Sequence, residues 1–186
     1  DPIEWIVTQR SIDNIQRGQW LTDEEIYVAL SLIRRLNPAI GGLTSTIALA
    51  HAQSRDFADH PENLYIMHCH GNHWVTAYTK CWWTYVELYD SLSTETVPAD
   101  IKKQLKKVVP GNKNVVQRCL QQQVGTSECG LFAIAVAVDL AMGIDPSYVR
   151  YEQGEMRKHF IDCIRKREIC SFPRIKDHRL QGYVFL

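Results

Sequence analysis

The sequence lacks several features that would place it in a specialised class of protein. No apolar run approaches the roughly 20 residues that a membrane helix requires, because the longest run, Cys129 to Val138, is closed by Asp139. There is also no internal repeat, low-complexity tract or secretory signal pattern. We therefore expect a protein without a membrane partner, and because the chain starts at Asp1 without a methionine, we interpret it as a domain of a longer protein.

Paired cysteines and net charge are absent as well. The six cysteines are widely spread, with no Cys-x-x-Cys pair, and the formal net charge is zero. A chain of 186 residues can fold without disulfides, so we expect reduced thiols and an intracellular location, nuclear or cytoplasmic. The lysines between Lys102 and Lys107 have no interleaved aromatic residues, which favours a solvated helix face over a nucleic-acid groove.

What is present indicates one globular α+β domain over residues 1–186, which we expect to be a monomer. The chain is 45% hydrophobic and 23% charged, an ordinary globular composition with enough apolar residues for a sizeable core. Hydrophobic periodicity predicts helices near residues 23–36, 45–52, 98–109, 129–142 and 152–166. Runs of aromatic and β-branched residues predict strands near residues 64–69, 73–79, 84–90 and 114–119.

Local signals fix the start of the first predicted helix. Thr22 and Glu25 form a capping box around its first turn, and Leu36 belongs to its buried stripe. The glycine pair Gly41-Gly42 then predicts a turn.

Cys129 has the surroundings of a catalytic nucleophile. It opens the most hydrophobic predicted helix, after a turn-prone stretch in which Thr126 or Ser127 is available as the N-cap. A helix N-terminus and a neighbouring histidine both favour the thiolate, which is the form that attacks a carbonyl carbon. A buried structural cysteine would explain this position alone equally well, so the interpretation depends on its neighbours.

A predicted hairpin supplies a base and a group that orients it. If Lys80–Trp83 is the loop and Thr79 faces Thr84, then His73 faces Asp90 on the neighbouring strand. The carboxylate can accept the imidazole N–H and thereby fix the tautomer. Together with the cysteine at the helix start, this spacing predicts a nucleophile, base and orienting acid.

The oxyanion of a tetrahedral intermediate also needs hydrogen-bond donors. The backbone N–H groups at the start of the cysteine helix are one source. A side-chain amide from Gln121, Gln122 or Gln123 could be another, and the residue pattern does not choose among the three.

A zinc site is the competing interpretation of the histidines. His68, Cys69, His70 and His73 place four possible ligands within six residues. In a strand, however, His68 and His70 would share one face and Cys69 would lie on the other, so a tetrahedral site would require a broken strand. We therefore expect neither a metal nor a cofactor.

In their order and spacing these residues resemble the ubiquitin-like-protein-specific (SUMO-protease-like) cysteine peptidases, which are related to the adenovirus endopeptidase. The segment from Trp20 to Asp23 resembles the family's Trp-Leu-x-Asp motif, and His73-Trp74 and Asp90-Ser91 resemble its His-Trp and Asp-Ser pairs. Gln123 lies six residues before Cys129-Gly130, where the family has its oxyanion glutamine. Single motifs of this length are weak signals, but their combination is specific.

The resemblance implies a papain-like α+β fold in which the cysteine helix packs on a central mixed or antiparallel sheet. It implies a thiol peptidase or isopeptidase that cleaves after the C-terminal Gly-Gly of SUMO, ubiquitin or a relative. Trp20 and Trp74 would roof the narrow tunnel that admits this glycine tail, although either could also be a core residue. Glu128, where the family usually has aspartate, is a departure from the pattern.

Three other functions fit the same residues. A related effector group uses a similar His, acid and Cys set to transfer an acetyl group from coenzyme A to proteins. The chain could also process a viral or transposon polyprotein at glycine-containing sites, or bind a modifier as an inactive relative. The sequence does not distinguish conjugate cleavage from precursor processing.

Overall fold

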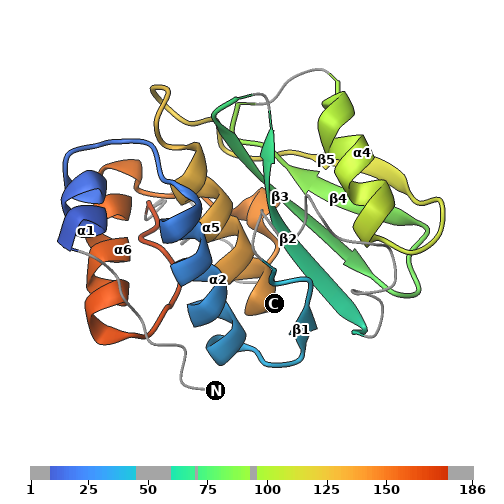
Figure 1. The fold of residues 1–186 in the computed structure, drawn as a ribbon, viewed down its shortest axis with the longest axis horizontal. Helices are drawn as coiled ribbons and strands as arrows, with labels where there is room; N and C mark the ends of the chain where they lie inside the picture. Colours follow the sequence, from blue (N-terminus) through green and yellow to red (C-terminus); the bar gives the residue numbers. More distant parts are fainter. Residues whose placement is uncertain (1–8, 45–59, 70, 93–95, 176–186) are drawn as a thin grey trace, which may run out of the picture.

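A five-stranded mixed sheet forms the centre of the protein, with helices on both faces (Figure 1). The structure, a computed structural model, describes residues 9–44, 60–69, 71–92 and 96–175. Within these ranges the helices are α1 (Gln9–Gln16), α2 (Asp23–Leu36), α4 (Ala99–Val108), α5 (Cys129–Ala141) and α6 (Gln153–Lys166), with a 3-10 turn η1 (Pro146–Tyr148). The strands are β1 (Ile40–Gly41), β2 (Glu62–Cys69), β3 (His73–Lys80), β4 (Tyr85–Tyr89) and β5 (Asn114–Arg118).

The strands lie side by side in chain order. The inner pairs, β2 with β3 and β3 with β4, are antiparallel, while β1 and β5 run parallel to their neighbours at the two edges. Helix α5 is buried along its whole length and packs on β2 and β3, and α1, α2 and α6 lie on the same side of the sheet (Figure 1). The predicted α+β fold, with a buried cysteine helix on a mixed sheet, is confirmed.

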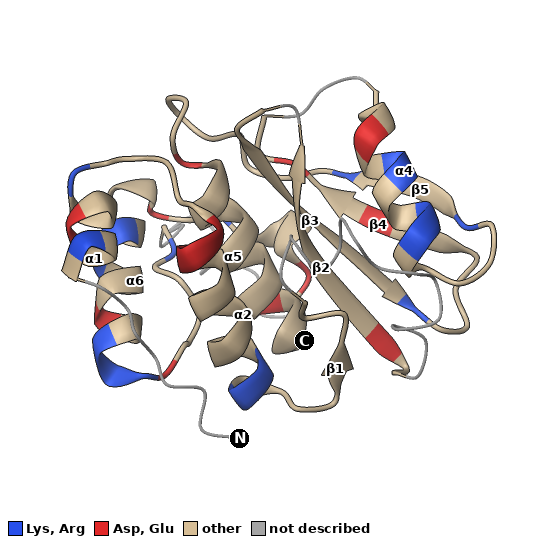
Figure 2. Cartoon of the chain, in the orientation of Figure 1, with Lys and Arg blue, Asp and Glu red and all other residues tan. Residues whose placement is uncertain are grey.

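Helix α4 covers the other face of the sheet. It buries Ile101, Leu105 and Val108 in a second apolar cluster, as its periodicity predicts. Its lysines lie on the outer side, where Lys102 and Lys106 are exposed (Figure 2). No described helix is long and apolar enough to span a membrane.

Helix α2 begins and ends where the sequence predicts. The Thr22 side chain accepts a hydrogen bond from the first turn, and the Glu25 carboxylate accepts one from the Thr22 backbone N–H at 2.6 Å. The prediction for Leu36 is wrong, because this residue is 37% exposed. Leu36 is the last residue of α2 and lies in the wall of an open hollow beside Arg167, Glu168 and Ile169 instead of in the core.

The hairpin of β3 and β4 has a different register from the one expected. Thr76 pairs with Tyr89, a shift of two residues, so the predicted pairing of Thr79 with Thr84 is wrong. The Thr79 hydroxyl instead donates to the Tyr85 carbonyl, and the loop between β3 and β4 consists of residues 81–84. Because successive side chains of a strand alternate between faces, an even shift leaves each one on its predicted face.

The sequence interpretation missed α1 and β1. Gly41-Gly42 is not a simple turn, because Gly41 belongs to β1, which pairs with β2. Gly42 has a φ of +77° and lies so close to β2 that a Cβ there would be 2.6 Å from the Leu64 carbonyl oxygen. The short helix expected near residues 45–52 falls outside the described residues.

Candidate active site

Cys129 is the first residue of α5, and its side chain lies at the end of β3. It is 1% exposed, and its thiol donates to the Asn72 carbonyl with an S···O distance of 3.8 Å. The expected N-cap, Thr126 or Ser127, is wrong: Glu128 holds the cap position, and no side chain caps the helix. The first backbone N–H groups of α5 therefore have no side-chain acceptor and can serve an oxyanion.

His73 connects the thiol to a buried carboxylate. Its Nε2–H donates to Asp90 at 2.7 Å, and the same Asp90 oxygen accepts the Leu92 backbone N–H at 2.8 Å. The buried Nδ1 of His73 has no hydrogen-bond partner among the described residues and is the nitrogen left for Cys129. Burial lowers the pKa of His73, but Asp90 and the neighbouring Cys129 outweigh it and raise this pKa to about 9. The arrangement can hold a thiol proton and return it.

The two-residue register shift explains how His73 and Asp90 still meet. Asp90 directly follows β4, and His73 is the first residue of β3. The shift makes them diagonal neighbours on one face, and their side chains are long enough to meet across this diagonal in a hydrogen bond of 2.7 Å.

The three candidate glutamines have different hydrogen-bond partners. Gln121 binds the backbone before α6 through both ends of its amide, and Gln122 donates within its own loop. Gln123, which is 9% exposed, accepts from the Ser91 hydroxyl at 2.7 Å and donates to the Gly125 carbonyl at 2.9 Å. A side-chain amide has two N–H groups, so Gln123 has a second donor besides the one bound to the Gly125 carbonyl. These contacts favour Gln123 over the other two.

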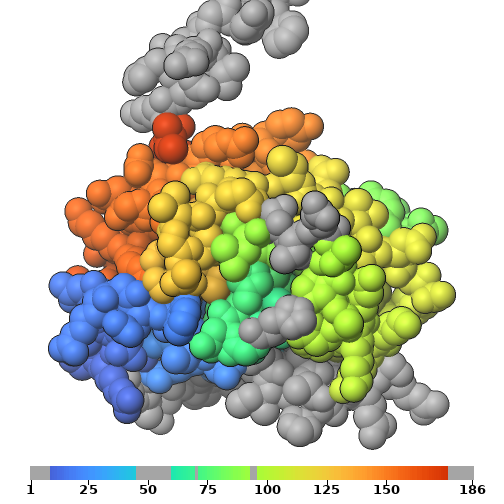
Figure 3. Space-filling view, turned by 90° about the horizontal axis from the view of Figure 1, so that it is seen from above, coloured from blue at the N-terminus to red at the C-terminus, as the bar shows by residue number. Residues whose placement is uncertain are grey.

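The two predicted tunnel tryptophans line one cavity. Its volume is about 470 Å³, and Asn72, whose carbonyl accepts the Cys129 thiol, is also in its wall. Trp20 is 45% exposed and donates from Nε1 to the Thr126 carbonyl, just before the cysteine helix. Trp74 is 4% exposed and donates to the Leu21 carbonyl, so most of its side chain packs in the hydrophobic core. Figure 3 looks onto this face, where the N-terminal segment in blue, the β2–β3 region in green and the loop before α5 in yellow meet.

Gly130 lets the tryptophan segment approach the cysteine helix. A Cβ at Gly130 would lie 2.9 Å from the Cβ of Leu21, closer than such atoms approach in proteins. The Trp-Leu and Cys-Gly motifs are therefore the two sides of one contact.

Three contributors to the site were missed at the level of sequence. Ser91 orients Gln123, and its only signal is that it follows Asp90. Asn72 contributes only a backbone carbonyl, which no residue pattern reveals. Arg157 of α6 pairs with Glu128 at 2.7 Å and also donates to backbone carbonyls in α1, between α1 and α2, and before α5. Its partners are distant in the sequence, so no local pattern could identify it.

The competing zinc site at the second strand does not form among the described residues. His68 packs its ring against Trp74 at a centroid distance of 4.7 Å, while His73 binds Asp90. His70 lies outside the described residues.

Comparison with solved structures places the fold. The protease domain of Ulp1, solved in complex with Smt3, the yeast ortholog of SUMO, matches with a TM-score of 0.66 and 14% identity over 83% of this chain and 80% of that one. The Ulp1-like SUMO protease catalytic domain of Chaetomium thermophilum matches with a TM-score of 0.56 and 18% identity, covering 78% and 70%. The Xanthomonas campestris effector XopD, bound to ubiquitin, matches with a TM-score of 0.54 and 14% identity, covering 77% and 91%.

At the level of sequence, no family model and no curated protein matches the chain. The structural likeness extends over most of the chain and of each relative. The chain therefore has the fold of the Ulp1-like SUMO proteases, the group that its motifs resemble.

Proposed function

We propose that the chain is a thiol peptidase or isopeptidase that cleaves after the C-terminal Gly-Gly of a ubiquitin-like modifier, SUMO, ubiquitin or a relative. The observation that carries the proposal is the alignment of Cys129 at the start of α5 with His73, which Asp90 holds at 2.7 Å. A buried helix start, an imidazole and a buried carboxylate that holds it are the parts of an activated thiol nucleophile. The fold supports the same activity.

The reaction uses each of these groups in turn. His73 Nδ1 takes the thiol proton, and the thiolate of Cys129 forms a bond to the carbonyl carbon of the modifier's last glycine. Backbone N–H groups of α5 and the second amide N–H of Gln123 stabilise the oxyanion. The C–N bond breaks as His73 protonates the departing amine, which leaves a thioester. Water then attacks the thioester, His73 takes a proton from it, and the free carboxylate and thiol are restored.

The cavity beside Trp20 and Trp74 suits a glycine tail. An exposed indole that is held by the Thr126 carbonyl can cover an extended backbone, and the buried indole beside it gives a rigid wall. Only glycine lacks a Cβ, so a Gly-Gly backbone can lie closer to the two indoles than other dipeptides can. Ulp1 in complex with Smt3 and XopD bound to ubiquitin are the relatives that motivate this substrate class.

We further propose that residues 1–186 form one catalytic domain that acts as a monomer. The structure has six free cysteines, as is common in reducing compartments, and an intracellular location, nuclear or cytoplasmic, is part of the proposal.

The decisive experiment compares Cys129→Ala with Cys119→Ala, a control that removes an exposed thiol. Both variants are assayed with SUMO and ubiquitin carrying a fluorogenic C-terminal amide, and with C-terminal electrophilic probes. We expect turnover to fall at least about 10³-fold in Cys129→Ala only, together with loss of probe labelling. Undiminished turnover in Cys129→Ala, or no labelling of the unsubstituted protein by any modifier probe, would refute the proposal.

The same assay distinguishes the finer alternatives. A panel of modifier probes reports which modifier is preferred, and isopeptide-linked conjugates tested beside linear precursors separate deconjugation from processing. An acetyltransferase would ignore the modifier probes and instead retain label from acetyl-coenzyme A on Cys129.

A further inference from the structure

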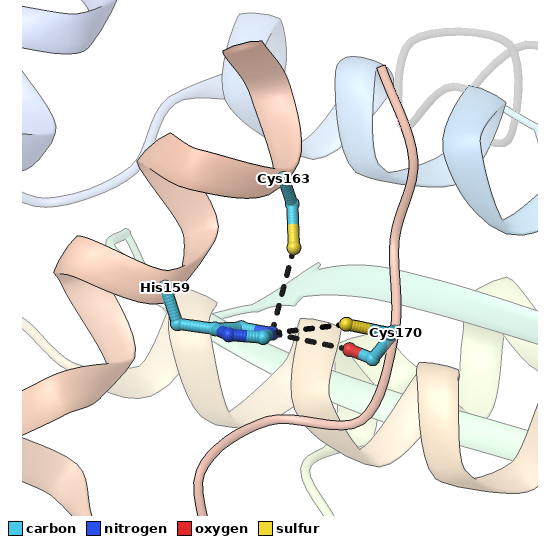
Figure 4. A group of neighbouring side chains, drawn as sticks. All are labelled: His159, Cys163 and Cys170. Carbon is cyan, nitrogen blue, oxygen red and sulfur yellow. Dashed lines mark hydrogen bonds between the residues drawn. The ribbon is translucent and has the colours of Figure 1, made fainter. Parts of the chain in front are cut away.

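A second group of chemically active side chains lies far along the chain from the candidate active site. His159 and Cys163 are four residues apart on α6 and so share one face of the helix. Cys170 comes from the segment that follows α6 and faces them (Figure 4). The ligand atoms of the three residues all lie within 4.8 Å of one another, the one such group of three among the described His, Cys, Asp and Glu side chains.

Two of the three distances are close to those of ligands that share one small cation, and the third, between the two sulfur atoms, is at most 4.8 Å. His159 Nε2 is 3.4 Å from the Cys163 sulfur and 4.0 Å from the Cys170 sulfur. Tetrahedral zinc, with Zn–S near 2.3 Å and Zn–N near 2.0 to 2.1 Å, separates such nitrogen and sulfur atoms by about 3.6 Å. Each observed separation differs from this value by a few tenths of an ångström, which small side-chain rotations can supply.

The ligand types select the metal. Two thiolates and an imidazole are soft and borderline ligands, which favour Zn²⁺ over Mg²⁺ or Ca²⁺. The position near the C-terminal end of α6 favours a cation as well, because helix carbonyls there carry partial negative charge. Cys163 is buried whereas Cys170 is exposed, so a fourth position remains open to water on the solvent side.

We propose that His159, Cys163 and Cys170 bind a Zn²⁺ ion that ties the segment after α6 to that helix. The ion takes no part in the proposed peptidase reaction, because its ligands are separate from Cys129, His73 and Asp90. The segment already packs Phe172 in the core beside His159, and Arg174 pairs with the buried Asp139 of α5. His159 Nε2 also lies 3.2 Å from the Cys170 carbonyl oxygen (Figure 4), and metal binding would replace this hydrogen bond with bonds from the ion to His159 and to the Cys170 sulfur.

The site is tested by titrating the full chain with Co²⁺, whose tetrahedral thiolate complexes absorb visible light, and by measuring zinc content after purification without chelator. All proteins carry Cys129→Ala, which removes the active-site thiol as a competing ligand. The test variant adds Cys170→Ser, and the matched control adds Cys119→Ser, another exposed cysteine. We expect one ion per chain and a thiolate spectrum in the control, and at least about a tenfold weaker affinity in Cys170→Ser.

Thermal unfolding adds a readout that does not depend on activity. Zn²⁺ should raise the unfolding temperature of the control but not that of Cys170→Ser, because only a bound ion stabilises the folded chain. The proposal is overturned if the two proteins bind Co²⁺ equally, or if neither binds it. A Cys163–Cys170 disulfide in the unreduced protein, detected by mass, would also overturn it.

Discussion

The protonation of His73 depends on two opposing influences. Burial lowers its pKa, whereas the bond to Asp90 and the nearby Cys129 raise it, and the net result is about 9 against an ordinary value of 6.5. A group with a raised pKa in the folded state stabilises that state fully below the unfolded value. This contribution is therefore complete below about pH 6.5 and is lost as the pH rises through about 9.

Replacing Asp90 by asparagine should lower the pKa of His73. In Asp90→Asn the burial of His73 remains while the carboxylate is gone, so the pKa of His73 should fall well below 9. The amide can also hold the wrong tautomer, and we expect turnover of a modifier substrate to fall about 10²- to 10⁴-fold. NMR titration of the His73 ring measures the pKa, and urea unfolding at several pH values should show less loss of stability between pH 6.5 and 9.

The matched control is Glu62→Gln, which neutralises a partly exposed carboxylate on β2. It should leave the His73 titration unchanged. An unchanged His73 pKa in Asp90→Asn would contradict the assignment of Asp90 as the orienting acid.

Gly130 should tolerate no side chain, although it lies in a helix where alanine normally stabilises. In Gly130→Ala the new Cβ would lie 2.9 Å from the Leu21 Cβ, and the Trp20–Leu21 segment would have to move. We expect the free energy of unfolding to fall by about 1 to 3 kcal/mol, together with weaker binding of a modifier tail. Urea unfolding and the KM for a modifier substrate measure the two effects.

Gly154 provides an internal comparison, because it is also the second residue of a helix. A Cβ there meets nothing closer than the Glu152 carboxylate oxygen at 3.8 Å, so Gly154→Ala should be neutral or stabilising by up to about 1 kcal/mol. Equal losses in Gly130→Ala and Gly154→Ala would show that the Leu21 contact is not the cause.

Among the secondary-structure elements, those with strong local signals were the ones that the sequence predicted. Helix α2 has a capping box and a period of 3.6, and α5 is apolar on every side, so both begin where expected. The strand β1 has only two residues and forms because β2 lies beside it, a contact that no local pattern encodes. The β3–β4 register depends on loop hydrogen bonds such as Thr79 to Tyr85, which are equally non-local.

The same distinction applies to the site. His73, Asp90 and Cys129 could be identified because alternation along strands and a helix start place them independently of the exact register. The His159 cluster was missed, and zinc was considered at His68 instead, because its ligands span a helix end and a following loop. A side chain that connects several segments leaves no periodic signal.

Arg157 also connects several segments of the chain, and we expect it to position the active site without touching substrate. Its guanidinium pairs with Glu128 at 2.7 Å and donates to the Ser127 and Gln19 carbonyls, which adjoin Cys129 and Trp20. Arg157→Ala should lower stability by about 3 kcal/mol, because it leaves Glu128 without its partner. It should also lower kcat more than it raises KM, since the helix start that carries the nucleophile loses its support.

Arg157→Lys separates geometry from charge. Lysine keeps the charge but lacks the planar fork that contacts several acceptors, so stability should recover in part and kcat should not. Lys158→Ala, at the next and exposed position of α6, should change neither quantity. If Arg157→Lys restored full kcat, charge alone would account for its role.

Across the whole molecule, a buried ionic network joins the central helix to the end of the described chain. Asp139 of α5 is 0% exposed and accepts from the Tyr151 hydroxyl at 2.7 Å and from Arg174 at 2.8 Å. A single bridge between Tyr151 and Arg174 aligns the two partners. The segment after α6 is therefore part of the folded core and should unfold with it.

Removing the positive charge of Arg174 from this network should lower the stability of the entire fold. In Arg174→Ala, Asp139 keeps the Tyr151 hydroxyl but loses a charged donor, and we expect a loss of about 1 to 3 kcal/mol in urea unfolding. Arg165→Ala, which breaks an exposed pair at 4.0 Å, should cost less than about 0.5 kcal/mol. In an Asp139→Asn background no carboxylate charge remains for Arg174, so the cost of Arg174→Ala should shrink. If that cost were the same in both backgrounds, the effect would come from packing of the segment and not from the buried charge.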